Sequence, residues 1–229
     1  MKMRTPHTLA ALTLGLFIAF PAQAALYDRG GGLVYDDVLN ITWLGDANYA
    51  KTSGYNYQPR SGYAFDGRMP WDIAKGWVGT LSFYDSVRNV TYTDWRLPTA
   101  SNQNPCSGYF CTSSEMGHMF YNNFGGTGGH DFNTGTNTAN IALFTNVQFA
   151  YWSGTTDAFY TTSYAWMFRN FGYQSLSHQD GELFAWAVRP GDVASVAAPI
   201  PEPETYALML AGFGFLGVMA LRRKQKTIA

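Results

Sequence analysis

The sequence predicts one α+β domain, residues 25–192, between two apolar segments at the ends of a 229-residue chain. Three observations carry this prediction. Two stretches with a helical spacing of apolar residues precede a long loop rich in Gly, Asn and Thr, and four strand-like pieces follow that loop. Helices grouped before strands favour an α+β domain with antiparallel strands over alternating βαβ units.

The first 24 residues have the three parts of a secretory signal peptide. Lys2 and Arg4 form the charged start, and residues 9–20 (LAALTLGLFIAF) form an apolar stretch too short to span a bilayer stably. Ala22-Gln23-Ala24 supplies the small residues of a cleavage site, so we expect cleavage before Ala25. The alternative is an uncleaved anchor helix, but anchors usually have a longer apolar run.

The first half of the domain is predicted to contain two short strands and a helix. Leu33–Asp36 follows three glycines, and Ile41–Leu44 follows a turn at residues 37–40. Within residues 71–81 the apolar side chains recur with the spacing of one helical face, and Pro70 suits the start of that helix. No internal repeat with a period of about 20 to 50 residues is expected.

The middle of the domain is predicted to hold a second helix and the long loop. Residues 94–99 (DWRLPT) end an extended piece, and Ser113-Ser114-Glu115 opens a helix that runs to Tyr121. Met116, Met119 and Phe120 are expected to face inward. Residues 124–140 form the loop.

Four strand-like pieces bounded by turn residues complete the domain, at residues 149–153, 165–169, 173–177 and 183–189. Aromatic residues are unusually frequent: 33 of the 174 residues between 25 and 198 are Phe, Tyr or Trp. We expect six tryptophans to belong to the core, namely Trp43, Trp77, Trp95, Trp152, Trp166 and Trp186.

The chain has only two cysteines, Cys106 and Cys111. In an oxidising compartment outside the cytoplasm they are expected to form a local disulfide across a turn at Gly108. Such a short loop gains little closure entropy, so the bond would hold a loop in place rather than hold the fold together.

The C-terminal tail has three parts after a small-residue linker at residues 193–200. Pro201-Glu202-Pro203 comes first, an apolar run at 206–221 follows, and Arg222, Arg223 and Lys224 end it. A helix over the apolar run would be about 24 Å long, and the basic side chains can extend it toward a hydrocarbon thickness of about 30 Å. We therefore predict a transmembrane helix there; a buried core helix is the alternative, disfavoured by three glycines and no polar face.

These three parts, in this order, resemble the PEP-CTERM sorting signal of Gram-negative bacteria, also described as the C-terminal domain of ice-binding proteins. The resemblance implies recognition by an exosortase, a membrane transpeptidase-like enzyme that would cleave near Pro201-Glu202-Pro203. It implies export through the inner membrane, transient anchoring by the C-terminal helix, and delivery to the outer envelope or extracellular matrix. Affinity for ice is not expected, because regular Thr-x-Thr arrays are absent.

The domain itself resembles the Lcl C-terminal-like domain, a bacterial family related in fold to C-type lectins and sulfatase-modifying factors. The matching segments are Leu33–Asp36, Leu44, the helix at Trp71, and residues 94–99, 151–155, 165–166 and 188–190. The resemblance implies a C-type-lectin-like fold whose first and last strands pair. It also implies that the long loop at 124–140 carries any ligand site.

Charge excludes several classes of protein. Residues 25–198 contain nine basic and 14 acidic residues, a net charge of −5, which gives no basic surface for nucleic acid. Positive residues flank both apolar ends, so both ends are expected on the cytoplasmic side with the domain translocated. A disordered chain is excluded because hydrophobic residues make up 46% of the sequence and charged residues only 14%.

Candidate ligand-binding residues lie in two loops. Tyr55, Tyr57, Arg60 and Tyr63 lie close together in the segment 54–65 with Phe65, and rings with an arginine can stack on sugars or dock a protein. The alternative is that this loop packs on the core. His130 and Asp131, in the glycine-rich loop, are a second candidate, although a metal ion is not predicted for them.

No catalytic motif appears, and no cofactor or metal is predicted. Glu115 and His118 share a helical face, but a di-iron site needs further ligands, so a surface helix is preferred. We expect a non-enzymatic envelope or matrix protein whose lectin-like domain binds an exopolysaccharide or a surface protein. The alternatives are an oxidative or metal-dependent enzyme related to sulfatase-modifying factors, using Cys106 and Cys111 or Glu115, His118 and His130, and a purely structural matrix component.

Overall fold

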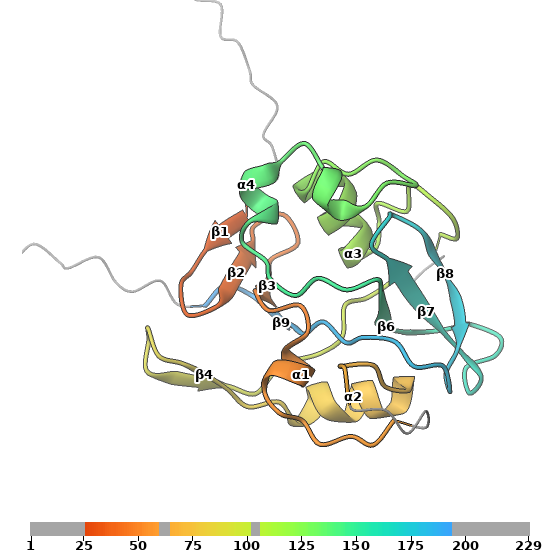
Figure 1. Cartoon of the computed structure of the whole chain (residues 1–229), viewed down its shortest axis with the longest axis horizontal. Coiled ribbons are helices and arrows are strands. Elements are labelled where there is room, and N and C mark those ends of the chain that lie inside the picture. Colours follow the sequence, from red (N-terminus) through yellow and green to blue (C-terminus); the bar gives the residue numbers. More distant parts are fainter. Residues whose placement is uncertain (1–25, 60–64, 102–105, 194–229) are drawn as a thin grey trace, which may run out of the picture.

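A computed structural model describes residues 26–59, 65–101 and 106–193 (Figure 1). In chain order the elements are β1 (Leu26–Asp28), β2 (Leu33–Asp36), β3 (Ile41–Leu44), α1 (Tyr49–Thr52), α2 (Trp71–Thr80), β4 (Phe83–Asp85), β5 (Val90–Tyr92), α3 (Glu115–His118), the π-helix η1 (Met119–Asn123), the 3-10 helix η2 (Phe132–Thr134), α4 (Thr138–Ile141), β6 (Ala150–Thr156), β7 (Tyr164–Arg169), β8 (Gln174–His178) and β9 (Val188–Pro190). The domain is therefore α+β, as predicted.

The strands form three sheets whose paired strands are antiparallel, with the orders β1-β2-β3-β9, β4-β5 and β6-β7-β8. In Figure 1 the first sheet and the β6-β7-β8 sheet lie side by side, α2 lies below them and α3 above. The β4-β5 hairpin projects to one side. The two large sheets thus share the interior that the helices close at either end.

The last strand returns to the start of the domain but does not pair with the first one. β9 pairs with β3, with Trp43 opposite Val188, and β1 and β9 form the two edges of the sheet. The expectation that first and last strands pair is therefore wrong. β2 is enclosed on both sides by β1 and β3, and the segment before β9 is bonded to the end of β3, where the Leu44 N–H donates to the Ala187 carbonyl at 3.1 Å, so β9 continues along β3. The buried Trp186 indole strengthens this closure by donating to the Leu44 carbonyl at 2.7 Å.

The hairpins β2-β3 and β4-β5 repeat one pattern, Tyr-Asp-x-Val-x-Asn, starting at Tyr35 and Tyr84. In both, the Asp carboxylate accepts hydrogen bonds from the backbone N–H groups two and three residues later, and the Tyr hydroxyl donates to the Asn side chain. Both asparagines have positive φ, 51° at Asn40 and 56° at Asn89. The expectation of no repeat is therefore wrong locally, because a six-residue match is too short to stand out in the sequence.

The two hairpins differ in the side chains that contact their fully buried carboxylate. Asp85 pairs with Arg88 at 2.7 Å, whereas the equivalent of Arg88 in the first hairpin is Leu39. Asp36 instead accepts a hydrogen bond from Asn123 Nδ2 at 2.7 Å, and the buried His118 places Nε2 4.0 Å away. The prediction that His118 lies on a surface helix is therefore wrong, because α3 packs this histidine over Asp36.

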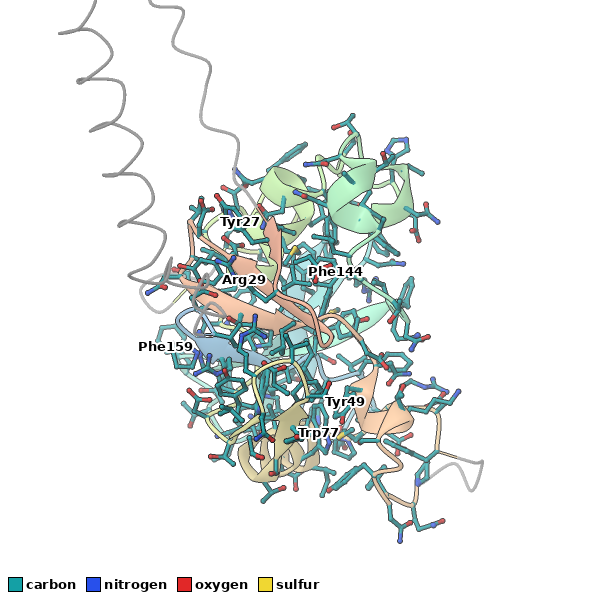
Figure 2. All side chains as sticks on the ribbon, turned by 90° about the vertical axis from the view of Figure 1, so that its left-hand side faces the viewer. Tyr27, Arg29, Tyr49, Trp77, Phe144 and Phe159 are labelled. Carbon is teal, nitrogen blue, oxygen red and sulfur yellow. A yellow bond between two sulfur atoms is a disulfide. The ribbon has the colours of Figure 1, made fainter. Side chains whose placement is uncertain are left out.

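The core has two parts, and the six expected tryptophans are all buried in it or beside it, at most 7% exposed. The first cluster lies around α2 and contains Trp77, Trp95 and Trp152. The second lies under α3 and η1 and contains Trp43 and Trp186. Figure 2 shows Trp77 of the first cluster and Phe144 of the second well apart in the molecule. Met116, Met119 and Phe120 face inward, as expected.

Several element boundaries differ from the predictions. The second helix is a single α-turn, α3, that continues as the π-turn η1 to Asn123. The loop at 124–140 contains η2 and the start of α4. Of the strand expected at 183–189, only β9 forms, because this segment crosses between sheets and bonds in turn to Met69, Ala150 and Leu44. The short elements β1, α1, β4 and β5 were not predicted.

Among the described residues, no helix is both long enough and apolar enough to cross a bilayer. The predicted membrane span at 206–221 lies outside those residues, as do the signal peptide with its cleavage site at Ala22, Ala24 and Ala25, most of the linker, and the sorting residues.

Candidate functional site

Two adjoining pockets open between α1, the segment before α2 and the segment before β6. Together we call them the polar groove. Their volumes are about 350 and 320 Å³, within the range of small-ligand sites. The residues that line them are Asn48, Lys51, Thr52, Asp66, Arg68, Asn146, Gln148, Phe149, Ala150, Glu182, Leu183 and Phe184.

The polar groove combines amides with charges of both signs. Its polar side chains come from four separate segments: Asn48 and Lys51, Asp66 and Arg68, Asn146 and Gln148, and Glu182. Amide and carboxylate groups offer donors and acceptors in fixed directions. The arrangement can therefore hold a neutral, hydroxyl-rich molecule by hydrogen bonds, with no metal required.

Local backbone geometry holds the two amides at one end of the groove. Asp46 Oδ1 accepts hydrogen bonds from the Asn48 backbone N–H at 2.9 Å and from Asn146 Nδ2 at 3.0 Å. Asn146 has φ 54°, a left-handed conformation that asparagine tolerates better than most residues. The buried Asn48 donates Nδ2 to the Asp66 carbonyl at 3.0 Å, while its Oδ1 has no partner among the described residues.

Gly67 permits this placement of Asn48. Its φ is 108°, and a Cβ at this position would lie 1.9 Å from Asn48 Oδ1. Only glycine therefore lets the 66–68 segment approach α1 so closely.

Asp66 and Arg68 form an ion pair at the mouth of the groove, with Nη2 2.8 Å from Oδ2. Burial raises the pKa of Asp66, but hydrogen bonds from the Arg68 side chain and backbone N–H outweigh it and bring that pKa below its ordinary value. Asp66 is therefore ionised at neutral pH. Because 42% of its side chain and 53% of that of Arg68 are exposed, the pair contributes under about 1 kcal/mol to stability.

Phe149 supplies an exposed ring at the other end of the groove. It precedes β6, and 57% of it is exposed to solvent. Phe184, which is buried, forms part of the lining of both pockets. The groove thus has polar walls with an aromatic surface at one end.

The predicted aromatic loop reaches this groove only in part. Tyr57 donates its hydroxyl to Glu182 Oε1 at 3.2 Å, and Tyr55 and Tyr57 both make edge-on contacts with Phe65. These three rings are half-buried against the first core cluster. Arg60 and Tyr63 lie outside the described residues. The loop therefore supports one wall, and its assignment as the binding surface stays a prediction.

His130 and Asp131 lie elsewhere. His130 is exposed, and Asp131 begins η2 by accepting a hydrogen bond from the Asn133 N–H at 3.2 Å. Asp131 Oδ2 also accepts from Asn170 Nδ2 at 2.7 Å. In the enzymatic alternative His130 would join Glu115 and His118, but the Glu115 carboxylate is held by Arg96 through two contacts of 2.7 Å.

Sequence reasoning missed most of the groove. Asn48 and Gln148 are separated by a hundred residues, and nothing in the local pattern links them. Asn146 follows no motif, and the exposure of Phe149 depends on where β6 begins. The one available signal was the Gly67 beside Asp66 and Arg68, which marks a close approach of backbone.

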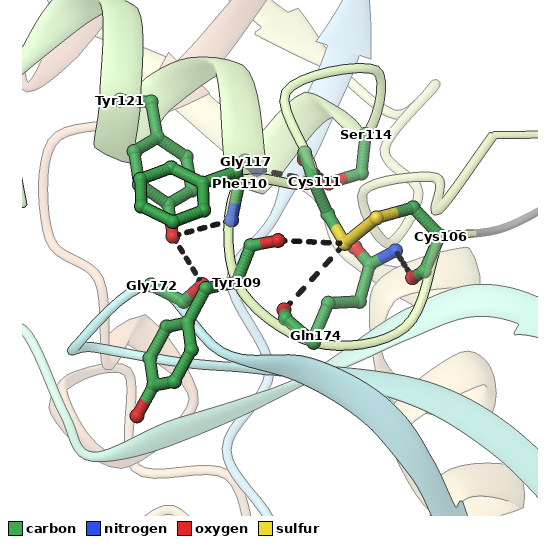
Figure 3. Close-up of a disulfide and its surroundings, with 10 residues drawn as sticks. Cys106, Tyr109, Phe110, Cys111, Ser114, Gly117, Tyr121, Gly172 and Gln174 are labelled. Atoms are coloured by element: carbon green, nitrogen blue, oxygen red, sulfur yellow. Dashed lines mark hydrogen bonds between the residues drawn. A yellow bond between two sulfur atoms is a disulfide. The ribbon is translucent and has the colours of Figure 1, made fainter. Parts of the chain in front are cut away.

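The predicted disulfide is present, with the sulfur atoms of Cys106 and Cys111 bonded at 2.03 Å (Figure 3). The loop that it closes is bonded to the β7-β8 hairpin: Gly108 and Gln174 exchange backbone hydrogen bonds of 2.8 and 2.9 Å, and Gln174 Nε2 donates to the Cys106 carbonyl. Figure 3 shows Tyr109 and Phe110 projecting away from the sulfurs. The bond therefore fixes the position of two exposed aromatic residues.

Replacing both cysteines by serine is expected to loosen this loop and leave the fold intact. The free energy of unfolding should fall by about 2 kcal/mol, because the closed loop is short. Amide hydrogen exchange should accelerate at Gly108 and Gln174, whereas the α2 amides, far from the bond, serve as the internal control. Faster exchange throughout α2 as well would contradict a purely local role.

The C-terminal tail carries Pro201-Glu202-Pro203, an apolar run and a basic cluster, in that order. Residues 199–224 match the PEP-CTERM protein-sorting motif. The PEP-CTERM motif implies that the chain is exported, processed by an exosortase and sorted to the cell envelope. The predicted sorting signal is confirmed, and exosortase is the partner that it implies.

Neither a curated protein nor a solved structure matches the chain. The resemblance of residues 25–192 to the Lcl C-terminal-like domain, with its C-type-lectin-like fold, therefore stays a prediction. What the PEP-CTERM motif establishes is the destination of the chain, and the function at that destination has to be argued from the domain.

Proposed function

We propose that the domain is lectin-like in activity and binds a polysaccharide of the cell envelope or extracellular matrix through the polar groove. The observation that carries the proposal is the exposed Phe149 beside a groove lined by amides and carboxylates. A sugar ring presents apolar C–H faces and a rim of hydroxyl groups. An aromatic ring next to directed hydrogen-bonding groups is complementary to both parts.

The aromatic and the polar parts of the groove would make different contacts with the sugar. Phe149 would stack on one sugar, and the carboxylates of Asp66 and Glu182 would accept hydrogen bonds from its hydroxyl groups. The Gln148 amide could both donate to these hydroxyl groups and accept from them. The two pockets share Asp66, Gln148 and Phe184 in their linings, so neighbouring sugars of one chain could occupy them together. An exosortase-sorted protein at the cell envelope would meet such polymers at high local concentration.

The disulfide favours binding over the oxidative alternative. Cys106 and Cys111 are the only cysteines of the chain and are bonded to each other, so neither is a reactive thiol in this state. Glu115 is engaged by Arg96, which leaves it poorly placed as a metal ligand. The binding proposal requires neither group.

Replacing Phe149 by alanine is expected to weaken polysaccharide binding about tenfold, because truncating one exposed aromatic contact commonly costs about 1.4 kcal/mol. A glycan array of envelope polymers first identifies a ligand, and titration calorimetry then compares the variants. Phe159→Ala is the matched control: Phe159 is 89% exposed, projects from the edge of the molecule in Figure 2 and does not line the groove.

The control should bind as tightly as the unmodified protein. Equal losses in the two variants would indicate nonspecific adhesion of exposed rings. The absence of binding to any polymer on the array would remove the proposal and favour a purely structural matrix role.

A further inference from the structure

One arginine differs from all the others in the described part of the chain. Five of the six arginines there pair with a carboxylate, with nitrogen-to-oxygen distances of 2.6–2.9 Å: Arg29 with Asp192, Arg68 with Asp66, Arg88 with Asp85, Arg96 with Glu115 and Arg189 with Asp94. Arg169 has no carboxylate partner within the described residues. In a domain with a net charge of −5, an unpaired arginine is an exception that requires a physical reason.

Arg169 is surrounded by aromatic rings instead. Its guanidinium carbon lies 5.7 Å from the centre of the Phe149 ring, 5.8 Å from Phe171 and 5.9 Å from Tyr173. Its Nε is buried and has no hydrogen-bond partner in the described part of the structure. The rings hold the cation in place but cannot neutralise its charge. They also cannot accept hydrogen bonds from the N–H groups, which point outward in the plane of the guanidinium.

The polar groups near Arg169 in the described part of the chain are engaged elsewhere. Asp131, the acidic side chain bonded to this hairpin, is held by Asn170 at 2.7 Å. Tyr109 packs edge-on against Tyr173 at 5.0 Å, and the disulfide loop fixes its position. Arg169 as a whole is only partly buried although its Nε is covered, so an anion would approach its outer N–H groups from solvent.

Phe149 links this site to the polar groove. The same ring lines the groove and lies against Arg169, because the residue before β6 sits beside the end of β7: the Asn170 N–H donates to the Phe149 carbonyl at 2.9 Å. A polymer stacked on Phe149 would therefore place its next sugar over Arg169.

We propose that Arg169 and the rings of Phe149, Phe171 and Tyr173 form a subsite for the carboxylate of an acidic sugar. The inference rests on the proposed function, which it narrows to polysaccharides that contain uronic acids. The planar guanidinium can donate two parallel hydrogen bonds to a carboxylate, and the rings offer faces for the pyranose that carries it. Aromatic surroundings exclude water and strengthen the contact, which offsets repulsion from the acidic domain.

The test compares three probes with one backbone: an oligomer of galacturonate, the same oligomer as its methyl ester, and an oligomer of galactose. The exported protein is titrated with each at pH 7 and low salt. We expect about tenfold tighter binding of galacturonate than of either neutral probe, as a charge-assisted bidentate contact would give. The preference should shrink at higher salt.

Arg169→Gln should remove this preference and leave galactose binding within about twofold. Lys75→Gln is the matched control, because Lys75 also lies over a ring, that of Trp71 at 4.5 Å, and its loss changes the net charge equally. That control should keep the preference. Arg169→Lys keeps the positive charge but lacks the planar guanidinium, so it should bind galacturonate with intermediate affinity. That result would show that the loss in Arg169→Gln does not come from a folding defect.

The outcomes separate the two proposals. Galacturonate preference that persists in Arg169→Gln overturns the subsite and leaves the groove proposal standing. If the unmodified protein binds galacturonate but not galactose, and Arg169→Gln abolishes galacturonate binding, the result supports the subsite and counts against the groove. Equal affinity of the unmodified protein for all three probes, or no binding of any, overturns the subsite.

Discussion

Replacing Arg88 by leucine is expected to lower the free energy of unfolding by about 3–5 kcal/mol. Arg88 Nη1 lies 2.7 Å from Asp85 Oδ2, and the side chains are 7% and 0% exposed. Without the guanidinium, Asp85 would remain as a buried carboxylate whose charge has no partner, whereas its backbone hydrogen bonds from Val87 and residue 88 would persist. The substitution also recreates the side chain that stands at Leu39 in the first hairpin.

The pH dependence identifies the cause. Burial raises the pKa of Asp85, but hydrogen bonds from Arg88 and from two backbone N–H groups outweigh it and hold the pKa below its ordinary value. A carboxyl with a lowered pKa stabilises the fold above its unfolded pKa of about 4, and this contribution is lost as the pH falls through the folded value. Urea unfolding should therefore show a large difference between unmodified protein and variant at pH 7 that narrows toward pH 3.

The double variant Asp85→Asn, Arg88→Leu is the control, because it removes both charges together. It should recover part of the lost stability at pH 7 and respond less to acid than the unmodified protein. A single Arg88→Leu variant that loses the same free energy at pH 3 as at pH 7 would assign the loss to packing and not to the unpaired charge.

Replacing Gly117 by alanine is expected to destabilise the protein by about 3 kcal/mol, although alanine is normally the better helix residue. A Cβ at Gly117 would lie 1.8 Å from the Cys111 backbone carbonyl oxygen, so α3 and the disulfide loop would have to separate. Ser114, which accepts from the Gly117 N–H at 3.0 Å and donates to the Cys111 carbonyl at 3.1 Å, would lose its bridging position.

Gly76→Ala is the matched control in α2, where no atom lies within 4 Å of the added Cβ. It should stabilise the protein by about 0.5–1 kcal/mol through helix propensity alone. Thermal or urea unfolding of both variants measures the effect, and opposite signs are expected. A neutral or stabilising Gly117→Ala would show that the loop moves away from α3 at little cost.

Sequence patterns predicted the elements whose structure depends on neighbours along the chain. Leu33–Asp36 and Ile41–Leu44 were predicted with the bounds that they have, and the helix at Trp71 differs by one residue at its end. Apolar periodicity and flanking turn residues decide such elements locally. The disulfide was predictable for a similar reason, since the chain has only these two cysteines and a turn at Gly108 between them lets them meet.

The partners of β9, His118 and Arg169 were not predictable in this way. β9 pairs with β3 because the segment before it is bonded to Leu44 at the end of β3, and His118 is buried because Asp36 lies beneath α3. The groove joins Asn48 to Gln148, and Phe149 touches both the groove and Arg169. Each of these contacts depends on which segments meet after folding. The periodicity of apolar residues along the chain does not show which segments those are.

The sequence by itself determined where the protein goes. A sorting enzyme recognises a tail such as 199–224 by the order of its residues along the chain, so the PEP-CTERM motif could be identified without a fold. Only the tertiary structure decided what the domain presents at that destination. Hydrogen-bonding groups and rings from segments a hundred residues apart acquire a joint chemistry only when the sheets and helices bring them to one surface.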